Sequence, residues 1–432
     1  MNYDLTIIGA GWAGFNAALK AKELGLKVCL IEKSHIGGTC LNVGCIPTKA
    51  LIHSAKVYSI SKKASGFGIE GNNPNPNFAK IQERKDKIIQ QLQKGMQFLL
   101  KDIDYINAEA KIISNQEIHA GGQDIKTKFI LIACGSKPTE LKNLKFDGKK
   151  IISSDDILKI KEIPKSLLVI GGGVIGCEFT SLFSNLGTQV SIVEMLPQLL
   201  PGVDNEVAKK VESLLKKKGI KINTNSDATT VDLGGYDLVL LCIGRAPNAE
   251  NLELEKIGVK LEKGKIIVDD YLKTSVENIY AAGDCTGKTM LAHYAAYQGT
   301  VAAENISKPT ANPIKADNTN VPNCIFTDPE ISSVGLSENA AKSKGIDIKM
   351  HKFDFMASGM AHILDETDGF VKIISDNKTE RVLGASIIGP KATELIAVLT
   401  IAISTQLKTS QIKDTIFAHP TLSESIEEAL KH

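Results

Sequence analysis

The hydrophobic pattern in the first half of the chain occurs twice. Leu5–Ile8 is a short apolar run, helical spacing of apolar residues continues to Leu24, and Val28–Glu32 is a second apolar run. Residues 167–194 show the same order of apolar run, helical spacing and apolar run. Short apolar runs favour buried strands, and apolar positions on one face at helical spacing favour a helix. The pattern therefore predicts two βαβ units built alike.

Each predicted unit has a glycine-rich turn between its first strand and its helix. Glu32 and Glu194 end the second strands of the two units at the same spacing from these glycines. Such a turn brings backbone N–H groups to a pyrophosphate at a helix N-terminus, and the acid accepts hydrogen bonds from ribose hydroxyls. Two copies predict two dinucleotide sites. The glycines are Gly9, Gly11 and Gly14 in the first unit and Gly171, Gly173 and Gly176 in the second.

The second dinucleotide is predicted to be NAD rather than NADP. The Glu194 carboxylate would repel the 2′-phosphate that distinguishes NADP. No Lys or Arg lies between Glu194 and Lys209 to bind such a phosphate.

The last part of the chain has a different pattern. Strand-like segments at 369–374 and 382–388 precede a long apolar helix at about 392–406. A stretch rich in proline and asparagine, 307–322, comes before them and favours a linker. These features predict a separate last domain.

Composition narrows the class of protein. The chain has 432 residues, of which 43% are hydrophobic, and a formal net charge of +2. That length suits two or three domains with real cores, and the near-neutral charge gives no basic surface for nucleic acid. The apolar runs are too short to cross a membrane, and the start of the chain leads directly into a strand without a signal peptide. We expect a cytoplasmic protein that binds neither nucleic acid nor membrane.

Cys40 and Cys45 are the candidate reactive groups. They lie close together among glycines, directly after the first predicted dinucleotide unit. Zinc is the competing interpretation, but no second pair or histidine set at ligand spacing accompanies them, so no metal site is predicted. In a cytosolic enzyme a close pair is more often redox-active. The other cysteines are isolated along the chain and are expected to be inert buried thiols: Cys29, Cys134, Cys177, Cys242, Cys285 and Cys324.

The residues after Cys45 favour a reactive thiolate. Pro47 suits the first turn of a helix, and the following residues continue it. Cys45 would then stand just before a helix N-terminus, which lowers the pKa of a thiol. The charge of Lys49, four residues later, would add to this effect.

His419 is the candidate base. Pro420 fixes the backbone that follows, and Glu424 lies five residues further on. A carboxylate on one ring nitrogen fixes the tautomer of a histidine and raises its basicity. A base with a pKa near neutral is what deprotonation of a thiol requires.

The stretch around Cys40 and Cys45 resembles the redox-active disulfide motif of the flavoprotein pyridine nucleotide-disulfide oxidoreductases. Within that family, the segments around Lys49 and His419 look most like those of the dihydrolipoamide dehydrogenases. Further matching motifs extend the resemblance over essentially the whole chain: Ala133–Pro138, Gly244–Asn248, Ile279–Cys285, Met290–His293 and His419–Glu424.

The resemblance implies an α/β fold with two Rossmann-like dinucleotide-binding domains plus a C-terminal α+β dimerisation domain. The implied segments are 1–150 for the FAD-binding domain with the redox disulfide, 151–270 for the NAD-binding domain, 271–318 for a return segment of the FAD domain and 319–432 for the interface domain. The FAD-binding residues carried over are Gly9, Gly11, Gly14, Glu32, Lys33, Thr39, Lys49, Ala110, Gly135, Asp284, Met290, Leu291 and Ala292. The NAD-binding residues carried over are Gly171, Gly173, Val174, Ile175, Gly176, Glu178, Glu194 and Gly244.

The resemblance also implies catalytic roles. Cys40 would exchange with substrate, and Cys45 would face the flavin as its disulfide partner. Lys49 and Glu178 would form an ion pair by the flavin ring, although the sequence pattern alone favours a solvent-facing Glu178. His419, held by Glu424, would reach the disulfide of the other subunit of a homodimer.

The implied reaction is oxidation of dihydrolipoamide to lipoamide with reduction of NAD⁺. The lipoyl group would belong to a lipoyl-bearing protein of a 2-oxo acid dehydrogenase or glycine cleavage complex. A glutathione reductase-like enzyme is the alternative substrate class, disfavoured because only Arg84, Arg245 and Arg381 are available to bind carboxylates. A noncatalytic FAD-bearing scaffold is the alternative from another class.

Some features depart from the family pattern. The stretch Gly219–Arg245 is short, so an antiparallel hairpin of the NAD domain is predicted to be trimmed. Trp12 replaces a small residue or proline in the first glycine turn, where it would cover a pyrophosphate or pack. Ala357–Asp365 lacks the family's small-Arg-Ala signature near the interface.

Overall fold

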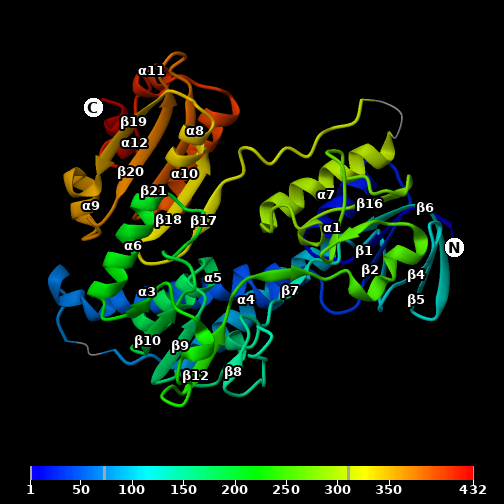
Figure 1. Cartoon of the computed structure of the whole chain (residues 1–432), viewed down its shortest axis with the longest axis horizontal. Coiled ribbons are helices and arrows are strands. Elements are labelled where there is room, and N and C mark those ends of the chain that lie inside the picture. The colour runs from blue at the N-terminus through cyan, green and yellow to red at the C-terminus, as the bar shows by residue number, and fades with distance from the viewer. Residues whose placement is uncertain (1, 72–73, 309–311, 432) are drawn as a thin grey trace.

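The computed structural model describes residues 2–71, 74–308 and 312–431, which form three main sheets. Figure 1 shows the first sheet with α1 and α7 in one lobe on the right, and the second and third sheets in the lower and upper parts of the left side. The first residue of the predicted first domain, residues 72–73 within it, the last residue of the predicted last domain and part of the predicted linker at 307–322 lie outside the described residues.

The first sheet is parallel at its centre, in the order β3-β2-β1-β6-β5-β4, with β16 also paired to β6. The later residues of the central strands, Leu5–Ile8 of β1 and Ile130–Ile132 of β6, are buried on both faces, which explains their continuous apolar runs. α1 (Trp12–Glu23) follows the first glycine turn and packs against α7 (Ala292–Ser307). The strands are β1 (Asn2–Ile8), β2 (Val28–Glu32), β3 (Asp104–Asn107), β4 (Lys111–Ser114), β5 (Glu117–Ala120), β6 (Gln123–Ile132) and β16 (Ile279–Ala281).

The second sheet repeats this design in five parallel strands, in the order β11-β10-β9-β12-β8. α5 (Val174–Asn185) follows the second glycine turn, and α6 (Asn205–Lys217) leads to the edge strand β11. Between β11 and β12, residues 224–237 form a loop with one short 3-10 helix and no hairpin, as predicted from the short sequence. The strands are β8 (Ile151–Ile152), β9 (Ser166–Ile170), β10 (Gln189–Val193), β11 (Lys221–Asn223) and β12 (Leu238–Leu241).

The third sheet is antiparallel, in the order β17-β18-β21-β20-β19. α10 (Ala392–Ser404) packs across β18 and β21, and α12 (Glu424–Lys431) packs against β19 and β20. The strands are β17 (Asn323–Ile325), β18 (Glu330–Gly335), β19 (Ile348–Asp354), β20 (Phe370–Asp376) and β21 (Val382–Gly389), and the shorter helices are α8 (Glu338–Ser343), α9 (Gly359–Ile363) and α11 (Thr409–Lys413).

Three helices connect the first lobe to the second sheet: α2 (Gly38–Val43), α3 (Cys45–Lys62) and α4 (Phe78–Leu99). α3 packs against both α4 and α5. Leu51 and Ala55 of α3 belong to the same apolar cluster as Phe179 and Leu182 of α5. The helix that begins at Cys45 is therefore fixed against the second dinucleotide unit.

Two further pairs of short strands, β7 (Ser136–Pro138) with β13 (Arg245–Pro247) and β14 (Leu261–Glu262) with β15 (Lys265–Ile266), complete the fold. The predicted α/β class, with two Rossmann-like units and a C-terminal α+β domain, is confirmed. We propose the segments 1–150, 151–270, 271–318 and 319–432 as its domain division. No helix among the described residues is long and apolar enough to cross a membrane.

Candidate active site

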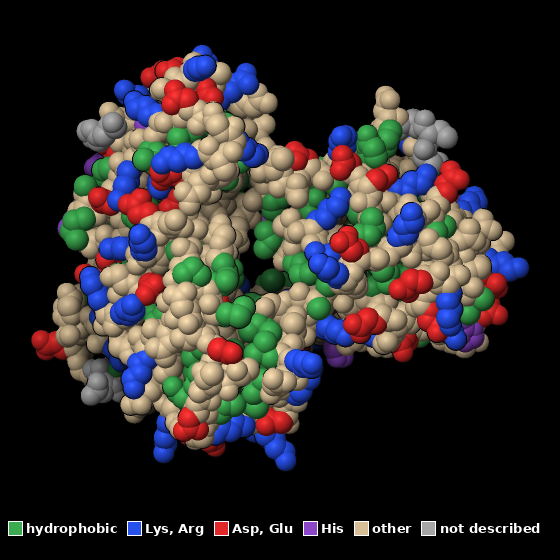
Figure 2. Space-filling model, in the orientation of Figure 1, with side chains coloured by type: hydrophobic (Ala, Val, Ile, Leu, Met, Phe, Trp, Pro, Cys, Tyr) green, Lys and Arg blue, Asp and Glu red, His purple; other side chains and the backbone are tan. Residues whose placement is uncertain are grey.

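One continuous cavity of about 2160 Å³ joins the two glycine turns and the cysteine pair. Figure 2 shows the molecule hollowed between the right-hand lobe and the left-hand parts, with hydrophobic side chains gathered around the hollow. The cavity is lined by most of the predicted site residues: Gly9, Gly11, Glu32, Lys33, Thr39, Cys40, Cys45, Lys49, Ala110, Gly135, Gly171, Gly173, Val174, Ile175, Glu178, Glu194, Gly244, Asp284, Met290, Leu291 and Ala292.

Gly14 and Gly176 do not line the cavity but lie beneath the two turns. A Cβ on Gly14 would overlap the carbonyl oxygen of Gly9, and a Cβ on Gly176 would overlap that of Gly171. The third glycine of each motif therefore permits close packing of the helix on the turn. This matches the spacing predicted for both units.

The acids that end β2 and β10 make matching hydrogen bonds. Glu32 Oε2 accepts from the Ala10 N–H at 2.8 Å, and Glu194 Oε2 accepts from the Gly172 N–H at 2.6 Å. The Oε1 atoms accept from Ser34 N–H at 2.8 Å and from Leu196 N–H at 2.7 Å. A carboxylate has about four acceptor positions, so each acid retains capacity for ribose hydroxyls.

The part of the cavity next to the first glycine turn, Gly9–Gly14, fits FAD. Asp284 follows β16 and lines the cavity, and its Oδ2 accepts a 2.6 Å hydrogen bond from the Ser136 hydroxyl. Arg245 donates to the Ser136 hydroxyl and carbonyl, each at 2.9 Å, and to Asp155 at 3.3 Å. The Trp12 indole N–H is buried in the cavity wall, close enough to Cys40 to act on the pKa of that thiol, and no described residue completes a well-formed hydrogen bond to it. A ligand with acceptor atoms along this wall would satisfy that donor.

The two candidate thiols lie together at the start of two consecutive helices. Cys40 is in α2, and Cys45 is the first residue of α3. The hydrogen bond that Cys40 donates to Cys45 lowers the pKa of Cys45 to about 7, and the positive charge of Lys49 acts in the same direction against the effect of burial. The same hydrogen bond and burial raise the pKa of Cys40. Cys45 is therefore the sulfur that the structure prepares as a thiolate.

Lys49 and Glu178 form the predicted ion pair. Lys49 Nζ lies 2.9 and 2.8 Å from the two carboxylate oxygens of Glu178, whose side chain is 4% exposed. Glu178 also accepts a 2.9 Å hydrogen bond from the Phe326 N–H, and Lys49 Nζ lies 4.8 Å from the centre of the Phe326 ring. A buried carboxylate requires partners of this kind.

His419 lies outside the cavity. Its side chain is 80% exposed, its Nδ1 is 2.8 Å from Glu424 Oε1, and Glu424 Oε2 accepts from the Thr421 N–H at 2.8 Å. These contacts with Thr421 and His419 lower the pKa of Glu424. Among the described residues no hydrogen bond to Nε2 of His419 is found, so the His–Glu arrangement is present but is not joined to the cysteines within one chain.

The structure adds three residues to the site that were not predicted as site residues from the sequence. Ser136, Arg245 and Phe326 hold Asp284 and Glu178 in place. Arg245 could have been proposed from the sequence, because it is one of only three arginines and lies in the family motif Gly244–Asn248. Phe326 gave no signal, because its contact depends on the third sheet approaching α5.

Three cysteines differ from the expectation of isolated buried thiols: Cys134, its neighbour Cys285, and Cys324, which is partly buried and lines the cavity. Cys134 is only partly buried and lines the cavity. It hydrogen-bonds to Cys285, and this contact together with burial raises the pKa of Cys285. Cys29 and Cys242 agree with the expectation, since burial raises the pKa of each to about 12. Among the described residues, no group of three or more His, Cys, Asp or Glu side chains is arranged to hold a metal ion.

The chain is similar to known flavoenzymes over nearly its whole length. It is 38% identical to a dihydrolipoyl dehydrogenase of Bacillus subtilis, covering 99% of this chain and 97% of that protein. It is 40% identical to the dihydrolipoyl dehydrogenase of Geobacillus stearothermophilus, covering 99% and 95%. The structure of the HOCl-induced flavoprotein disulfide reductase RclA from Escherichia coli superposes with a TM-score of 0.89 at 30% identity, covering 99% of both chains.

Family matches cover both parts of the fold. Residues 3–299 match the pyridine nucleotide-disulphide oxidoreductase family, and residues 321–430 match the dimerisation domain of the same family. The first match contains both glycine turns and the cysteine pair, and the second contains the third sheet and His419. The chain therefore belongs to the pyridine nucleotide-disulphide oxidoreductases, as an NAD-dependent flavoprotein enzyme whose cofactors are FAD and NAD.

Proposed function

We propose that this enzyme oxidises dihydrolipoamide to lipoamide and reduces NAD⁺. The observation that carries the proposal is the cysteine pair, with its low-pKa Cys45 and adjacent Lys49, in a cavity that both glycine turns line. Relatives at 38–40% identity over nearly the full chain are named dihydrolipoyl dehydrogenases. Of the three arginines, only Arg245 lines the cavity, and it is already hydrogen-bonded to Ser136. This favours an uncharged dithiol over a substrate with two carboxylates.

The first step is deprotonation of a substrate thiol. We assign it to Nε2 of His419, since Nδ1 faces Glu424. Since His419 lies outside the cavity of its own chain, we propose that it serves the cysteine pair of a second copy. The match to a dimerisation domain at 321–430 supports a homodimer of this kind.

The second step is thiol–disulfide exchange. The substrate thiolate attacks the Cys40 sulfur of the oxidised pair, the Cys40–Cys45 bond breaks, and Cys45 leaves as a thiolate. His419 passes the first proton to solvent and then takes the proton of the second substrate thiol, and the thiolate so formed attacks the first substrate sulfur. This closes the lipoamide disulfide and releases Cys40, which takes a proton from His419. The positive charge of Lys49 favours the departing Cys45 thiolate and so assists the first exchange.

The reduced pair then holds two electrons. When bound, FAD would supply the chemistry that links re-formation of the Cys40–Cys45 disulfide, a two-electron oxidation, to hydride transfer to NAD⁺. Glu32, Asp284 and the Gly9–Gly14 turn would hold FAD, and Glu194 with the Gly171–Gly176 turn would hold NAD. The Lys49 ammonium group is held in an ion pair with Glu178, and its positive charge stabilises the Cys45 thiolate.

We propose that the physiological substrate is a lipoyl-bearing protein of a 2-oxo acid dehydrogenase or glycine cleavage complex. The relatives at 38–40% identity that are named dihydrolipoyl dehydrogenases support this substrate class. We further propose that the dimer works in the cytoplasm.

The test is a steady-state assay of NADH formation from dihydrolipoamide, with NADH-dependent reduction of glutathione disulfide as the control substrate. Cys45→Ser is expected to keep bound FAD and to lose at least about a thousandfold in kcat, because removing a covalent participant has an effect of this size. Dihydrolipoamide turnover by Cys45→Ser at the wild-type rate would contradict the assigned role. A wild-type protein that carries FAD but turns over neither substrate would favour a scaffold.

A further inference from the structure

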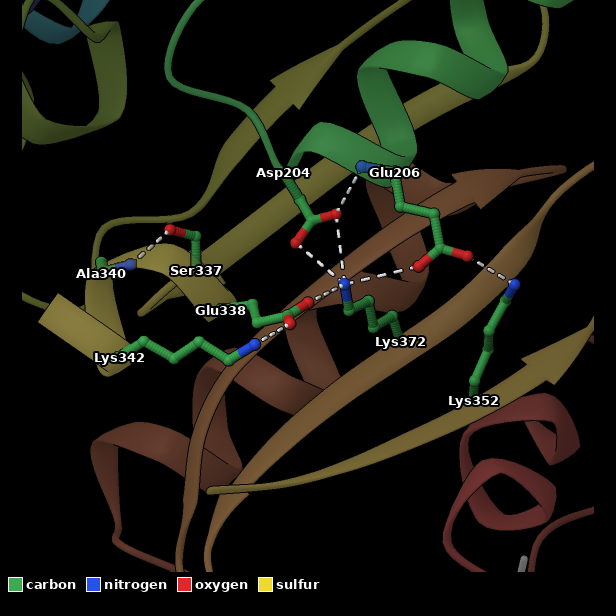
Figure 3. A network of polar contacts seen from close by, with 8 residues as sticks. All are labelled: Asp204, Glu206, Ser337, Glu338, Ala340, Lys342, Lys352 and Lys372. Carbon is green, nitrogen blue, oxygen red and sulfur yellow. Dashed lines mark hydrogen bonds and ion pairs between the residues drawn. The ribbon is translucent and has the colours of Figure 1, made fainter. Parts of the chain in front are cut away.

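A buried lysine joins the dimerisation domain to the second dinucleotide unit. Lys372 lies on β20, and its Nζ is 3.1 Å from Asp204 Oδ2, 2.8 Å from Glu338 Oε2 and 3.4 Å from Glu206 Oε2. Figure 3 shows the three carboxylates converging on this one nitrogen from the start of α6 and from α8. The side chains of Lys372 and Asp204 are 5% and 4% exposed.

The buried charge of the Asp204 carboxylate is compensated by Lys372. Burial alone would lower the pKa of Lys372, but its hydrogen bonds to Glu338 and Asp204 outweigh burial and raise it. The two glutamates also have outer partners, since Glu206 pairs with Lys352 at 2.6 Å and Glu338 pairs with Lys342 at 2.6 Å. Among the described residues, Asp204 has no cationic partner besides Lys372.

Asp204 holds the end of a segment that walls the NAD half of the cavity. Its Oδ1 accepts a 3.0 Å hydrogen bond from the Glu206 N–H and so caps the N-terminus of α6. The preceding residues, 195–203, run from the ribose acid Glu194 to this cap. We call residues 195–203 the NAD-wall loop. Met195, Leu196 and Pro201 of this loop line the cavity.

The NAD-wall loop is also packed against the glycine turn itself. Leu199 and Leu200 are buried, and the Leu200 N–H donates a 2.8 Å hydrogen bond to the Gly172 carbonyl. The Leu199 side chain fills the space that a Cβ on Gly172 would need. A shift of the loop at Asp204 would therefore move the backbone that faces the pyrophosphate.

We propose that Lys372 is a positioning residue for NAD: from the dimerisation domain it holds Asp204, and through Asp204 it sets the NAD-wall loop. The inference uses NAD as the ligand of the second turn and extends the proposed function to the control of its affinity. Loss of Lys372 leaves a buried, uncompensated Asp204 carboxylate, which must turn toward solvent and release the loop.

The test uses the FAD-loaded enzyme and two lysine variants matched in charge. Lys372→Met is expected to weaken NAD⁺ binding, measured by calorimetry, about tenfold, and to raise KM for NAD⁺ about tenfold, with kcat and KM for dihydrolipoamide unchanged. Lys352→Met, which removes only the outer pair of Glu206, is expected to leave NAD⁺ affinity within about twofold of wild type.

Asp204→Asn tests the Lys372–Asp204 ion pair by changing its acidic partner. It also tests the proposal if Lys372→Met fails to fold. Asparagine keeps the helix cap but not the charge, so several-fold weaker NAD⁺ binding is expected, and the double variant should bind no more weakly than Lys372→Met alone. Variants with a lower Tm but wild-type NAD⁺ affinity would overturn the proposal and leave a structural ion cluster. If the wild type binds NAD⁺ but oxidises no dithiol, the proposed substrate fails while this test still applies.

Discussion

The two glycine turns have the same internal geometry but different neighbours. In both, the terminal acid accepts from the second residue of the turn, and the third glycine allows the helix to pack on the first. Beside the first turn lie Trp12 and α2 with Cys40, whereas beside the second lies the NAD-wall loop that ends at Asp204. The shared part recognises what dinucleotides have in common, and the neighbours decide what chemistry each one meets.

The largest effect on this comparison is expected from alanine at the third glycine of each turn. Gly14→Ala should lower FAD affinity and Gly176→Ala should lower NAD⁺ affinity, each roughly ten- to hundredfold, because an added methyl group overlaps a backbone carbonyl and overpacking costs about 1–3 kcal/mol. FAD content by absorbance and NAD⁺ binding by calorimetry measure the two effects. If Gly176→Ala lost FAD as well, the turns would not be independent sites.

A smaller effect is expected from the acids. Glu194→Gln should weaken NAD⁺ binding roughly tenfold, since a hydrogen bond to a charged group contributes about 1.5 kcal/mol. Glu32→Gln should do the same for FAD and leave NAD⁺ binding unchanged. The ratio of kcat/KM for NAD⁺ to that for NADP⁺ should also fall in Glu194→Gln, because a repulsive charge has been removed. An unchanged ratio would mean that another group excludes the 2′-phosphate.

The smallest effect concerns pH and the cysteine pair beside the first turn. In the reduced enzyme, a Cys45 pKa of about 7 lies below the ordinary thiol value, so the thiolate is favoured above pH 7 and is lost as the pH falls through 7. The alkylation rate of Cys45 by iodoacetamide, followed by peptide mass spectrometry, should be about half its plateau at pH 7 and fall about tenfold per unit below. In Cys40→Ala the midpoint should move to higher pH, because the donated hydrogen bond is gone. A midpoint that stays near 7 would assign the low pKa to Lys49 and the α3 N-terminus alone.

The features that depend on neighbours in the sequence were predictable. Both βαβ units, the terminal acids and the helix that begins at Cys45 follow from apolar spacing, glycine positions and Pro47, since all of these act over one or two elements. The short link between β11 and β12 was also predicted, because the stretch Gly219–Arg245 has fewer residues than the family pattern.

The features that depend on distant packing were not predictable from pattern alone. Glu178 sits in the middle of α5, where a carboxylate normally faces solvent, and only the approach of α3 and Phe326 makes its burial tolerable. The resemblance supplied that pair, whereas nothing supplied Lys372, which meets Asp204 across 168 positions of sequence. The contact between Cys134 and Cys285 was missed for the same reason.

The packing of α3 against α5 has a consequence for how this enzyme tolerates change. The sulfur of Cys45 is carried by a helix whose later residues, Leu51 and Ala55, sit in the core of the second nucleotide unit. Each residue inserted into or deleted from an α-helix rotates everything before it by about 100° relative to everything after it. The direction in which the Cys45 sulfur points therefore depends on how this one helix is rotated in the core. In a chimera that exchanges the first lobe, α3 would have to stay with the second dinucleotide unit against which it packs.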